Sequence, residues 1–333
     1  MKAIIPTAGV GSRLRPFTHT VPKVLLQVAD KPILGHILDK IIEIGVGEAT
    51  FVVGYLGSMI EDYVRRAYPG LRANFVEQAD PRGLGHAILL TAPHHRDDSE
   101  PVLIILGDTI LDADLSVLRG ADSDMIGVCE VDDPRRFGVV ELDGERIVSM
   151  VEKPEHPPSK MAIVGVYYLR RPAVLFDALE RNVAEGRLTK GEIQLTDGLA
   201  RMIEEGATMR AFPVKGWHDC GKPETLLATN EALLRERFGG EAGWVEARYP
   251  RTRINPPVYI DPTAVLTDAI VGPNVTVGAG ATISQAIVRN SIVNAGAEVQ
   301  NVILTDSIIG NDARVRESSL RLYVGDRSEI LFG

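Results

Sequence analysis

A glycine-rich loop near the N-terminus carries the residues best suited to bind phosphate. It reads AGVGSRLRPFTHTVPK over residues 8–23 and follows MKAIIPT, a short apolar run typical of a buried strand. Gly9 and Gly11 allow a ligand to approach the backbone without obstruction by side chains. Arg13 offers a planar fork to phosphate oxygens, and Lys23 offers a point charge. The loop therefore predicts a phosphate site.

The loop fits neither of the two common phosphate motifs. A Walker A loop would end in Gly-Lys-Ser or Gly-Lys-Thr, and the segment has no such ending. The third glycine of a dinucleotide fingerprint is replaced here by Leu14. The residues alone indicate an enzyme that binds a phosphate ligand by another motif.

Two aspartates follow strand-like segments elsewhere in the chain. Asp108 ends the run VLIILGD, and Asp219 lies in the turn-like segment WHDCG. Magnesium is commonly bound by one or two carboxylates, while phosphate and water oxygens complete its coordination shell. Each aspartate alone is also a common turn residue. Together, beside a polyphosphate, they are candidate ligands of Mg²⁺.

The segments that must position these residues alternate between strand and helix over residues 1 to about 235. KAIIPT, ATFVVG and PVLIILGD read as strands, whereas ILGHILDKIIEIG and SMIEDYVRRAY have apolar residues at helical spacing. This order predicts an α/β fold with a Rossmann-like mixed, mainly parallel sheet flanked by helices. Ligands of such sheets bind beyond the carboxyl ends of the strands, where the glycine-rich loop and Asp108 lie.

The pattern changes after about residue 237. A stretch rich in Gly, Pro and Arg predicts a linker over 237–257, after a first domain of residues 1–236. Three steps of five or six residues make one turn of a triangular coil, so we expect a hexapeptide-repeat parallel β-helix over 258–333. A β-sandwich would instead show period-two alternation over longer strands. The aliphatic residues that recur at this spacing are Val271, Val277, Ile283, Val288, Val293, Val299, Leu304, Ile309 and Val315.

Composition and charge restrict the partners of the protein. The chain has 333 residues, and its formal net charge of −9 leaves no basic excess for a nucleic-acid backbone. No stretch approaches the roughly 18 apolar residues of a membrane span. The two cysteines are too few for a disulfide framework. The N-terminal apolar run is short and breaks at Pro6, so we expect no signal peptide and a cytoplasmic protein without nucleic-acid or membrane partners. Because the ends of a β-helix are open, we also expect a homo-oligomer.

The N-terminal part of the chain resembles the sugar-nucleotide pyrophosphorylases, which are nucleotidyltransferases that act on a nucleoside triphosphate and a sugar 1-phosphate. GVGSRLRPFTHTVPK matches the opening signature of that family, G-x-G-[ST]-R-[LM]-x-P-x-T-x-x-x-P-K, throughout. Further matches follow in the family's order over residues 1–235, namely LLQVADKPIL, LGD, FGVV, VEKP, VGVYYL, KGEIQLTD and WHDCGKPETLLATN.

Two subfamilies share these features. The last motif and the tail are most similar to the long form of glucose-1-phosphate thymidylyltransferase, which ends in a left-handed β-helix. The segments GLGHA and GEIQLTD are equally similar to the bacterial UTP–glucose-1-phosphate uridylyltransferases. The resemblance therefore implies a left-handed β-helix and small-molecule substrates.

The resemblance also implies a role for each matching position. The implied catalytic residues are Arg13, Lys23, Asp108 and Asp219. The two aspartates among them would hold Mg²⁺ as the cofactor. The implied nucleotide-binding residues are Gly9, Gly11, Ser12, Arg13, Gln78 and Gly83. The implied sugar-phosphate-binding residues are Gly138, Glu152, Lys153 and Lys190.

The resemblance also implies which part of the nucleotide each of these residues contacts. Arg13 would contact the β- and γ-phosphates of the nucleotide, and Lys23 would bridge the reacting phosphates. Gln78 and Gly83 would read the edge of the base. The implied reaction is in-line attack by an oxygen of the sugar 1-phosphate on the α-phosphorus, with release of pyrophosphate. Because that oxygen is already ionised, no general base is needed, and catalysis rests on positioning and charge neutralisation.

Several alternatives stay open. Uracil and thymine share one hydrogen-bonding edge, so the nucleotide is UTP or dTTP, and glucose 1-phosphate is the favoured hexose 1-phosphate. A bifunctional nucleotidyltransferase and acetyltransferase is one rival, because hexapeptide β-helices often carry acyltransferase sites. None of the seven histidines lies in the tail, however, and such sites typically use one as a base. A non-catalytic subunit that senses sugar nucleotides is the other rival, although the cationic set is intact.

Two further residues, His86 and Cys220, stand close to these motifs. His86 in GLGHA opens a predicted helix near the expected base pocket, either as a helix residue or as a ligand contact. Cys220 stands beside Asp219, and we expect a small buried residue rather than a reactive thiol.

Overall fold

The computed structural model describes residues 1–96, 100–240 and 248–316. They form two compact units, Met1–Thr229 and Asn230–Gly333. The division falls inside helix α7 (Pro223–Phe238), whereas the sequence placed the end of the first domain at residue 236. Parts of the predicted linker (241–247) and of the predicted β-helix domain (317–333) lie outside the described residues.

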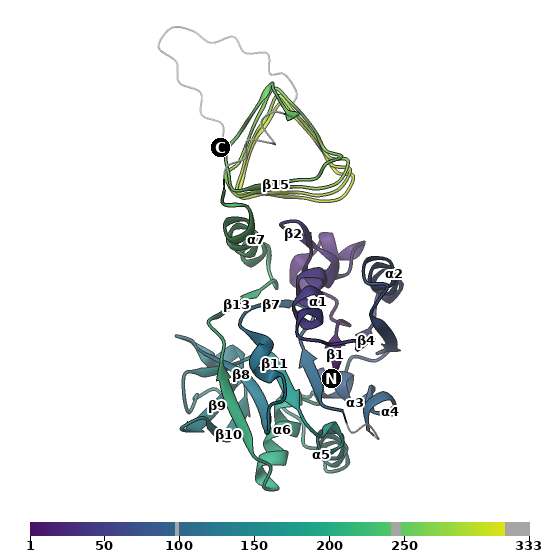
Figure 1. Ribbon diagram of the computed structural model, residues 1–333, viewed down its shortest axis with the longest axis vertical. Coiled ribbons are helices and arrows are strands. Elements are labelled where there is room, and N and C mark those ends of the chain that lie inside the picture. The colour runs from purple at the N-terminus through teal and green to yellow at the C-terminus, as the bar shows by residue number, and fades with distance from the viewer. Residues whose placement is uncertain (97–99, 241–247, 317–333) are drawn as a thin grey trace. The chain divides into compact units, whose positions relative to one another are not determined.

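The first unit is built on one large mixed sheet, visible in Figure 1. Its strands are β1 Lys2–Pro6, β4 Glu48–Val53, β5 Arg72–Glu77, β6 Val102–Ile105, β8 Asp124–Glu130, β9 Gly138–Asp143, β10 Arg146–Glu152, β11 Met161–Leu169 and β12 Met209–Pro213. They lie in the order β5-β4-β1-β6-β11-β8-β12-β10-β9. The first four strands in that order are parallel, and β11 runs antiparallel to both of its neighbours. The predicted α/β fold with a mixed sheet is confirmed.

Helices flank the sheet and bury its apolar strands. They are α1 Ile33–Glu43, α2 Gly57–Ala67, α3 Leu84–Leu89, α4 Ala92–His95, α5 Pro172–Ala184 and α6 Leu195–Glu204. Ile88 of α3, Leu175 of α5 and Leu199 of α6 join the strand residues in one buried core. This core explains why the fully apolar run of β6 forms a central strand. Within the described part of the chain, no helix is both long enough and apolar enough to cross a bilayer.

Short elements shape the loops that connect these strands and helices. They are the 3₁₀ helices η1 Ser12–Leu14, η2 Phe17–His19, η3 Lys23–Leu25, η4 Leu115–Leu118 and η5 Pro134–Arg136, and the strands β2 Gln27–Val28, β3 Lys31–Pro32, β7 Thr109–Asp112 and β13 Gly216–Asp219. Strands β7 and β13 pair with each other as an antiparallel ribbon outside the main sheet.

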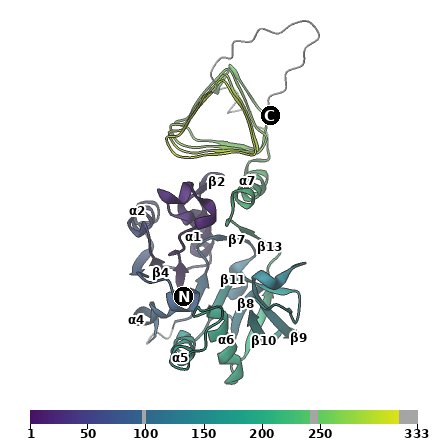
Figure 2. The same cartoon turned by 180° about the vertical axis from the view of Figure 1, so that it is seen from behind.

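The second unit is the predicted parallel β-helix, whose triangular coils are seen end-on in Figure 2. Its strands are β14 Thr252–Ile254, β15 Val258–Ile260, β16 Val265–Thr267, β17 Ala269–Val271, β18 Val275–Val277, β19 Thr282–Ser284, β20 Ile287–Arg289, β21 Ile292–Val293, β22 Glu298–Gln300, β23 Ile303–Thr305, β24 Ile308–Ile309 and β25 Arg314–Arg316. They form three parallel sheets of four strands, in the orders β14-β17-β20-β23, β15-β18-β21-β24 and β16-β19-β22-β25. The first strand lies inside the range 237–257 that the sequence assigned to a linker.

The interior of the β-helix follows the predicted repeat. Val271, Val277, Ile283, Val288 and Val293 are all buried, as is Val299. The last three predicted positions are only partly buried, because each belongs to the last described strand of its sheet. Left-handed backbone at the corners, for example at Asn274 and Asn290, lets the chain turn between sheets.

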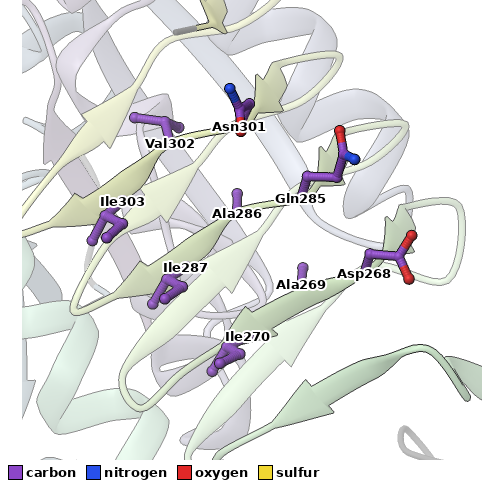
Figure 3. A pocket seen from close by; sticks show the side chains of 9 residues that line it. All are labelled: Asp268, Ala269, Ile270, Gln285, Ala286, Ile287, Asn301, Val302 and Ile303. Atoms are coloured by element: carbon purple, nitrogen blue, oxygen red, sulfur yellow. The ribbon is translucent and has the colours of Figure 1, made fainter. Parts of the chain in front are cut away.

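One outer face of the β-helix carries a row of apolar side chains. Ile270, Ile287 and Ile303 stand in register on three stacked strands, and Figure 3 shows them aligned. Asp268, Gln285 and Asn301 form a polar rim beside them. The exposed fraction of Ile303 is 69%, and Ile270 and Ile287 are partly buried, whereas the aliphatic residues of the interior are buried.

A matched pair of substitutions tests the stacked interior. Ile283→Ala is expected to lower the free energy of unfolding by about 2–5 kcal/mol, because it leaves a cavity between Leu266 and Val299. Ile303→Ala removes the same atoms from an exposed face and should cost less than about 1 kcal/mol. Denaturant titration of the full chain, followed by circular dichroism, measures both. Equal losses for the two variants would contradict the assignment of interior and exterior.

Candidate active site

The β7–β13 ribbon brings the two predicted metal ligands together. Asp219, the last residue of β13, pairs in register with Thr109, the residue after Asp108. The amide of Cys220 donates a hydrogen bond of 3.3 Å to the carbonyl oxygen of Asp108. Asp108 and Asp219, which are distant in sequence, therefore lie next to each other at the same end of the ribbon.

Lys23 lies against Asp108 as a buried cation. Its Nζ is 2.5 Å from Oδ2 of Asp108, and the lysine itself is buried. The loop closes on this lysine because Gly11 has φ of +66°, and a Cβ at Gly11 would lie 3.0 Å from the Cβ of Lys23. A side chain at position 11 would be strained and crowded, so glycine is required there. Thr18 secures the same turn by donating to the carbonyl oxygen of Gly11 at 2.9 Å.

A cradle at Gly221 is bordered by Asp219 and Arg13. A Cβ at this glycine would lie 2.7 Å from Oδ1 of Asp219 and 2.9 Å from Nη2 of Arg13. The missing side chain thus leaves a carboxylate and a guanidinium facing the same space. The neighbouring Cys220 is buried, and burial raises the pKa of its thiol to about 12. The thiol is therefore neutral at physiological pH, as the sequence predicted for a packing residue.

The donor set of this site suits magnesium in the company of phosphate. Asp108 and Asp219 supply carboxylate oxygens, which Mg²⁺ prefers, and both residues line the central cavity described below. Mg²⁺ usually takes only one or two carboxylates from a protein and fills its shell with phosphate and water oxygens. In residues 1–96, 100–240 and 248–316, no group of three or more His, Cys, Asp or Glu side chains is arranged to hold a metal.

Two adjoining cavities open around Asp108. The N-terminal cavity has a volume of 330 Å³, and its lining includes Gly9, Lys23, Gln78, Gly83 and Asp108. The central cavity has a volume of 350 Å³, and its lining includes Arg13, Asp108, Gly138, Glu152, Lys153 and Asp219. The residues that line both cavities are Leu84, Leu106, Asp108 and Glu192. The Lys23–Asp108 ion pair therefore stands where the two cavities meet.

The β9–β10 hairpin builds one wall of the central cavity. Its register places Glu152 opposite Gly138, and a Cβ at Gly138 would lie 3.2 Å from Oε2 of Glu152. The same carboxylate accepts a hydrogen bond of 2.7 Å from Oγ1 of Thr196, and Nζ of Lys153 lies 3.1 Å from Oε1. Burial, followed by the nearby Glu152 charge, raises the pKa of Tyr167, which lines this cavity as a neutral phenol.

Three of the residues implied by the resemblance lie outside both linings. Gly11 packs behind Lys23, Ser12 is exposed, and Lys190 is exposed at the tip of a tight turn closed by Thr189 and Glu192. Arg13 lines the central cavity rather than the N-terminal one.

The central cavity has further lining residues to which the sequence analysis gave no role. They include Arg136, Phe137, Glu192, Gln194, Thr196, Tyr167 and Trp217. Of these seven, all except Arg136 lie inside motifs quoted above, so those motifs could have pointed to them. Arg136 carried no signal, because two adjacent arginines after a proline are typical of an exposed turn.

Comparison with known proteins shows which family and which solved structures this chain is similar to. Residues 2–236 match the nucleotidyl transferase family. The chain is 31% identical to the glucose-1-phosphate thymidylyltransferase of Streptomyces antibioticus, over 88% of this chain and 86% of that protein. It is 34% identical to a UTP–glucose-1-phosphate uridylyltransferase of Haloferax volcanii, over 71% of this chain and 98% of that protein. A solved UDP-glucose pyrophosphorylase in complex with UDP-glucose is 28% identical, with a TM-score of 0.61 over 71% of this chain and 99% of that one.

Proposed function

Since this chain belongs to the nucleotidyl transferase family, we propose that it makes a nucleoside diphosphate sugar and pyrophosphate from UTP or dTTP and a hexose 1-phosphate. Glucose 1-phosphate is the favoured sugar substrate, because similar proteins from Streptomyces antibioticus and Haloferax volcanii carry that substrate in their names. The single observation that carries the proposal is the meeting of two cavities at the Lys23–Asp108 ion pair.

The two cavities suit the two substrates. We assign the nucleotide to the N-terminal cavity, where glycine backbone, Lys23 and Gln78 are available, and the hexose 1-phosphate to the central cavity. An oxygen of the sugar phosphate would attack the α-phosphorus of the nucleotide, forming a new P–O bond. The bond between the α-phosphorus and its bridging oxygen to the β-phosphorus breaks, and pyrophosphate carries away that electron pair. Both substrates are anions, so the reaction depends on cations where they meet.

The charged residues around Asp108 have separate tasks in this proposal. Lys23 is placed to neutralise charge on the reacting phosphates, and Arg13 to hold a phosphate oxygen in the central cavity. Asp108 and Asp219 would hold Mg²⁺, which withdraws charge from phosphate oxygens when it is bound. The Lys23–Asp108 pair keeps a buried cation compensated until a phosphate enters.

The sugar ring would be held by the hairpin wall. The Glu152 carboxylate can accept hydrogen bonds from sugar hydroxyls, and Thr196 and Lys153 fix its two oxygens in place. The absent side chain at Gly138 keeps space beside that carboxylate. Lys153 and Arg136 add cations at the same wall for the sugar phosphate.

Replacing Thr196 by Val tests the sugar site. The hydroxyl that orients Oε2 of Glu152 is lost, so the KM for hexose 1-phosphate should rise by about 10-fold with little change in the KM for the nucleotide. Thr91→Val is a matched control, because it removes a hydroxyl with an equally short bond of 2.7 Å, to the carbonyl oxygen of Ile88, outside both cavities. Steady-state kinetics separate the two constants, and an equal rise in both KM values would refute the assignment.

The decisive experiment for the function is a substrate matrix. Pyrophosphate release is measured for UTP, dTTP, CTP, ATP and GTP, each with the 1-phosphates of glucose, galactose, mannose and N-acetylglucosamine. The expected result is Mg²⁺-dependent release, fastest for UTP or dTTP with glucose 1-phosphate. No release from any combination, or release with purine nucleotides alone, would overturn the proposal.

A further inference from the structure

The amide of Gln78 is held in one orientation inside the N-terminal cavity. Gln78 is buried and lines that cavity. Its Nε2 lies 3.3 Å from the carbonyl oxygen of Gly83 and 3.1 Å from Nδ1 of His86. The Gly83 carbonyl can only accept, so the amide must turn its NH₂ group toward it. Both amide hydrogens then have partners, while no described residue bonds to the amide oxygen, which is left for a ligand.

His86 can hold the amide only through one tautomer. A neutral imidazole has one accepting nitrogen, so Nδ1 can accept from Gln78 only when the proton is on Nε2. Nη2 of Arg82 can only donate a hydrogen bond, and it lies 2.9 Å from that same Nε2. Gln78 and Arg82 therefore compete for one lone pair.

The geometry indicates which donor gives way. Arg82 is exposed over 56% of its side chain, and its Nε has Asp80 as another partner at 3.5 Å. Gln78 is buried, and its NH₂ group is also held by Gly83. Burial first, and then the Arg82 charge, lower the pKa of His86, while Asp80 raises it. The ring is thus neutral near pH 7 and retains its accepting nitrogen.

We propose that His86 is a positioning residue that fixes the Gln78 amide with its oxygen toward the base and thereby selects uracil or thymine over cytosine. This inference rests on the proposed function and adds the origin of the base preference. Uracil and thymine present an N3–H donor, which the amide oxygen accepts. Cytosine presents an accepting N3 at the same place, and two acceptors repel each other. A free amide could rotate by 180° and accept either base.

The test compares UTP with CTP in binding and in turnover. Calorimetric titration with each nucleotide and Mg²⁺ gives the affinity ratio without any reaction, and pyrophosphate release gives the ratio of kcat/KM. The unmodified protein should prefer UTP by about 10-fold or more, the factor expected for one buried unpaired polar contact. His86→Leu should reduce this preference to less than about 3-fold, through a higher KM for UTP and a nearly unchanged kcat. His86→Asn, whose side-chain oxygen can accept in place of Nδ1, should restore the preference.

Two further variants control for indirect effects. His95→Asn alters another buried histidine, which lies 3.0 Å from Oγ1 of Thr50 and outside both cavities, and it should leave the ratio unchanged. Arg82→Met removes the competing donor and should maintain or increase the UTP preference. A fall in preference for Arg82→Met would show that Arg82 supports the orientation of the Gln78 amide instead of competing for His86, and this would overturn the inference.

The remaining outcomes separate this inference from the proposed function. An unchanged UTP-to-CTP ratio in His86→Leu, or no preference in the unmodified protein, overturns the role of His86 while turnover still supports the function. Binding of UTP without any pyrophosphate release overturns the function, whereas a binding ratio that falls in His86→Leu and returns in His86→Asn still supports the role of His86.

Discussion

Asp108→Asn is expected to lower the rate of pyrophosphate release by about 10³-fold, because it weakens the binding of Mg²⁺, whose charge is worth several kcal/mol of transition-state stabilisation. Asp108 lines both cavities and pairs with Lys23. The neutral amide is a weaker ligand for Mg²⁺, so the Mg²⁺ concentration that gives the half-maximal rate should also rise. Chelation of divalent cations should stop release by the unmodified protein, and added Mg²⁺ should restore it.

The control for this variant is Asp112→Asn, the same change at the exposed end of β7, the strand that begins directly after Asp108. Its activity should stay within about twofold of the unmodified protein, because surface substitutions away from special features have small effects. Full activity in Asp108→Asn, or equal losses in both variants, would remove Asp108 from the reaction.

A loss of folding must be distinguished from a loss of chemistry. Asp108→Asn leaves the buried Lys23 ammonium without its carboxylate, so the variant should be destabilised by about 1–3 kcal/mol. Adding Lys23→Met removes that orphaned charge and should recover most of the lost stability. Activity in the double variant should be lower than in Lys23→Met alone. Equal activity in the double variant and in Lys23→Met would mean that Asp108 acts only through the fold.

Lys23→Met alone is expected to lower kcat by about 10²–10³-fold. This is the usual cost of removing one protein charge or hydrogen-bond donor that is preorganised to stabilise charge on the reacting groups. Methionine fills much of the volume of the buried lysine stem, and the side chain of Asp108 is 38% exposed, so water can solvate the carboxylate. The fold should therefore be retained. Steady-state rates of pyrophosphate release and a denaturant titration measure the two effects separately.

Lys31→Met is the matched control for this variant. Lys31 makes an ion pair of the same length, 2.5 Å, with Asp39, and it lies outside both cavities. Its loss should leave kcat within about twofold, because a single exposed ion pair contributes little. If the two lysine variants lost activity alike, the effect would be general rather than specific to the meeting point of the cavities.

The positions of the elements were predictable because local patterns carry them. The apolar run of β6 and the helical spacing of α1 are visible in the sequence, and both elements form where expected. The β-helix repeat is equally local, and the first six of its predicted aliphatic positions are buried. The corner residues were less predictable, because a positive φ at Gln285 has no clear sequence signal.

The meeting of the site residues was not predictable from spacing. The resemblance to a family supplied Asp108 and Asp219 as a pair, but neither residue's surroundings in the sequence point to the other. Their proximity depends on the register of β7 and β13, and the pairing of Lys23 with Asp108 depends on how the N-terminal loop folds back. The same holds for the contact of Gln78 with His86, which fixes an amide that the sequence left free to turn.

By itself, then, the sequence determined the two architectures and the kinds of chemical group available, since periodicity and turn residues act over a few neighbouring positions. The tertiary structure alone decided that Arg13 borders the central cavity, that Asp219 and Arg13 both pack closely against Gly221, and that one ion pair stands between two cavities. The physical reason is that strand order and register set the distances between residues remote in the chain.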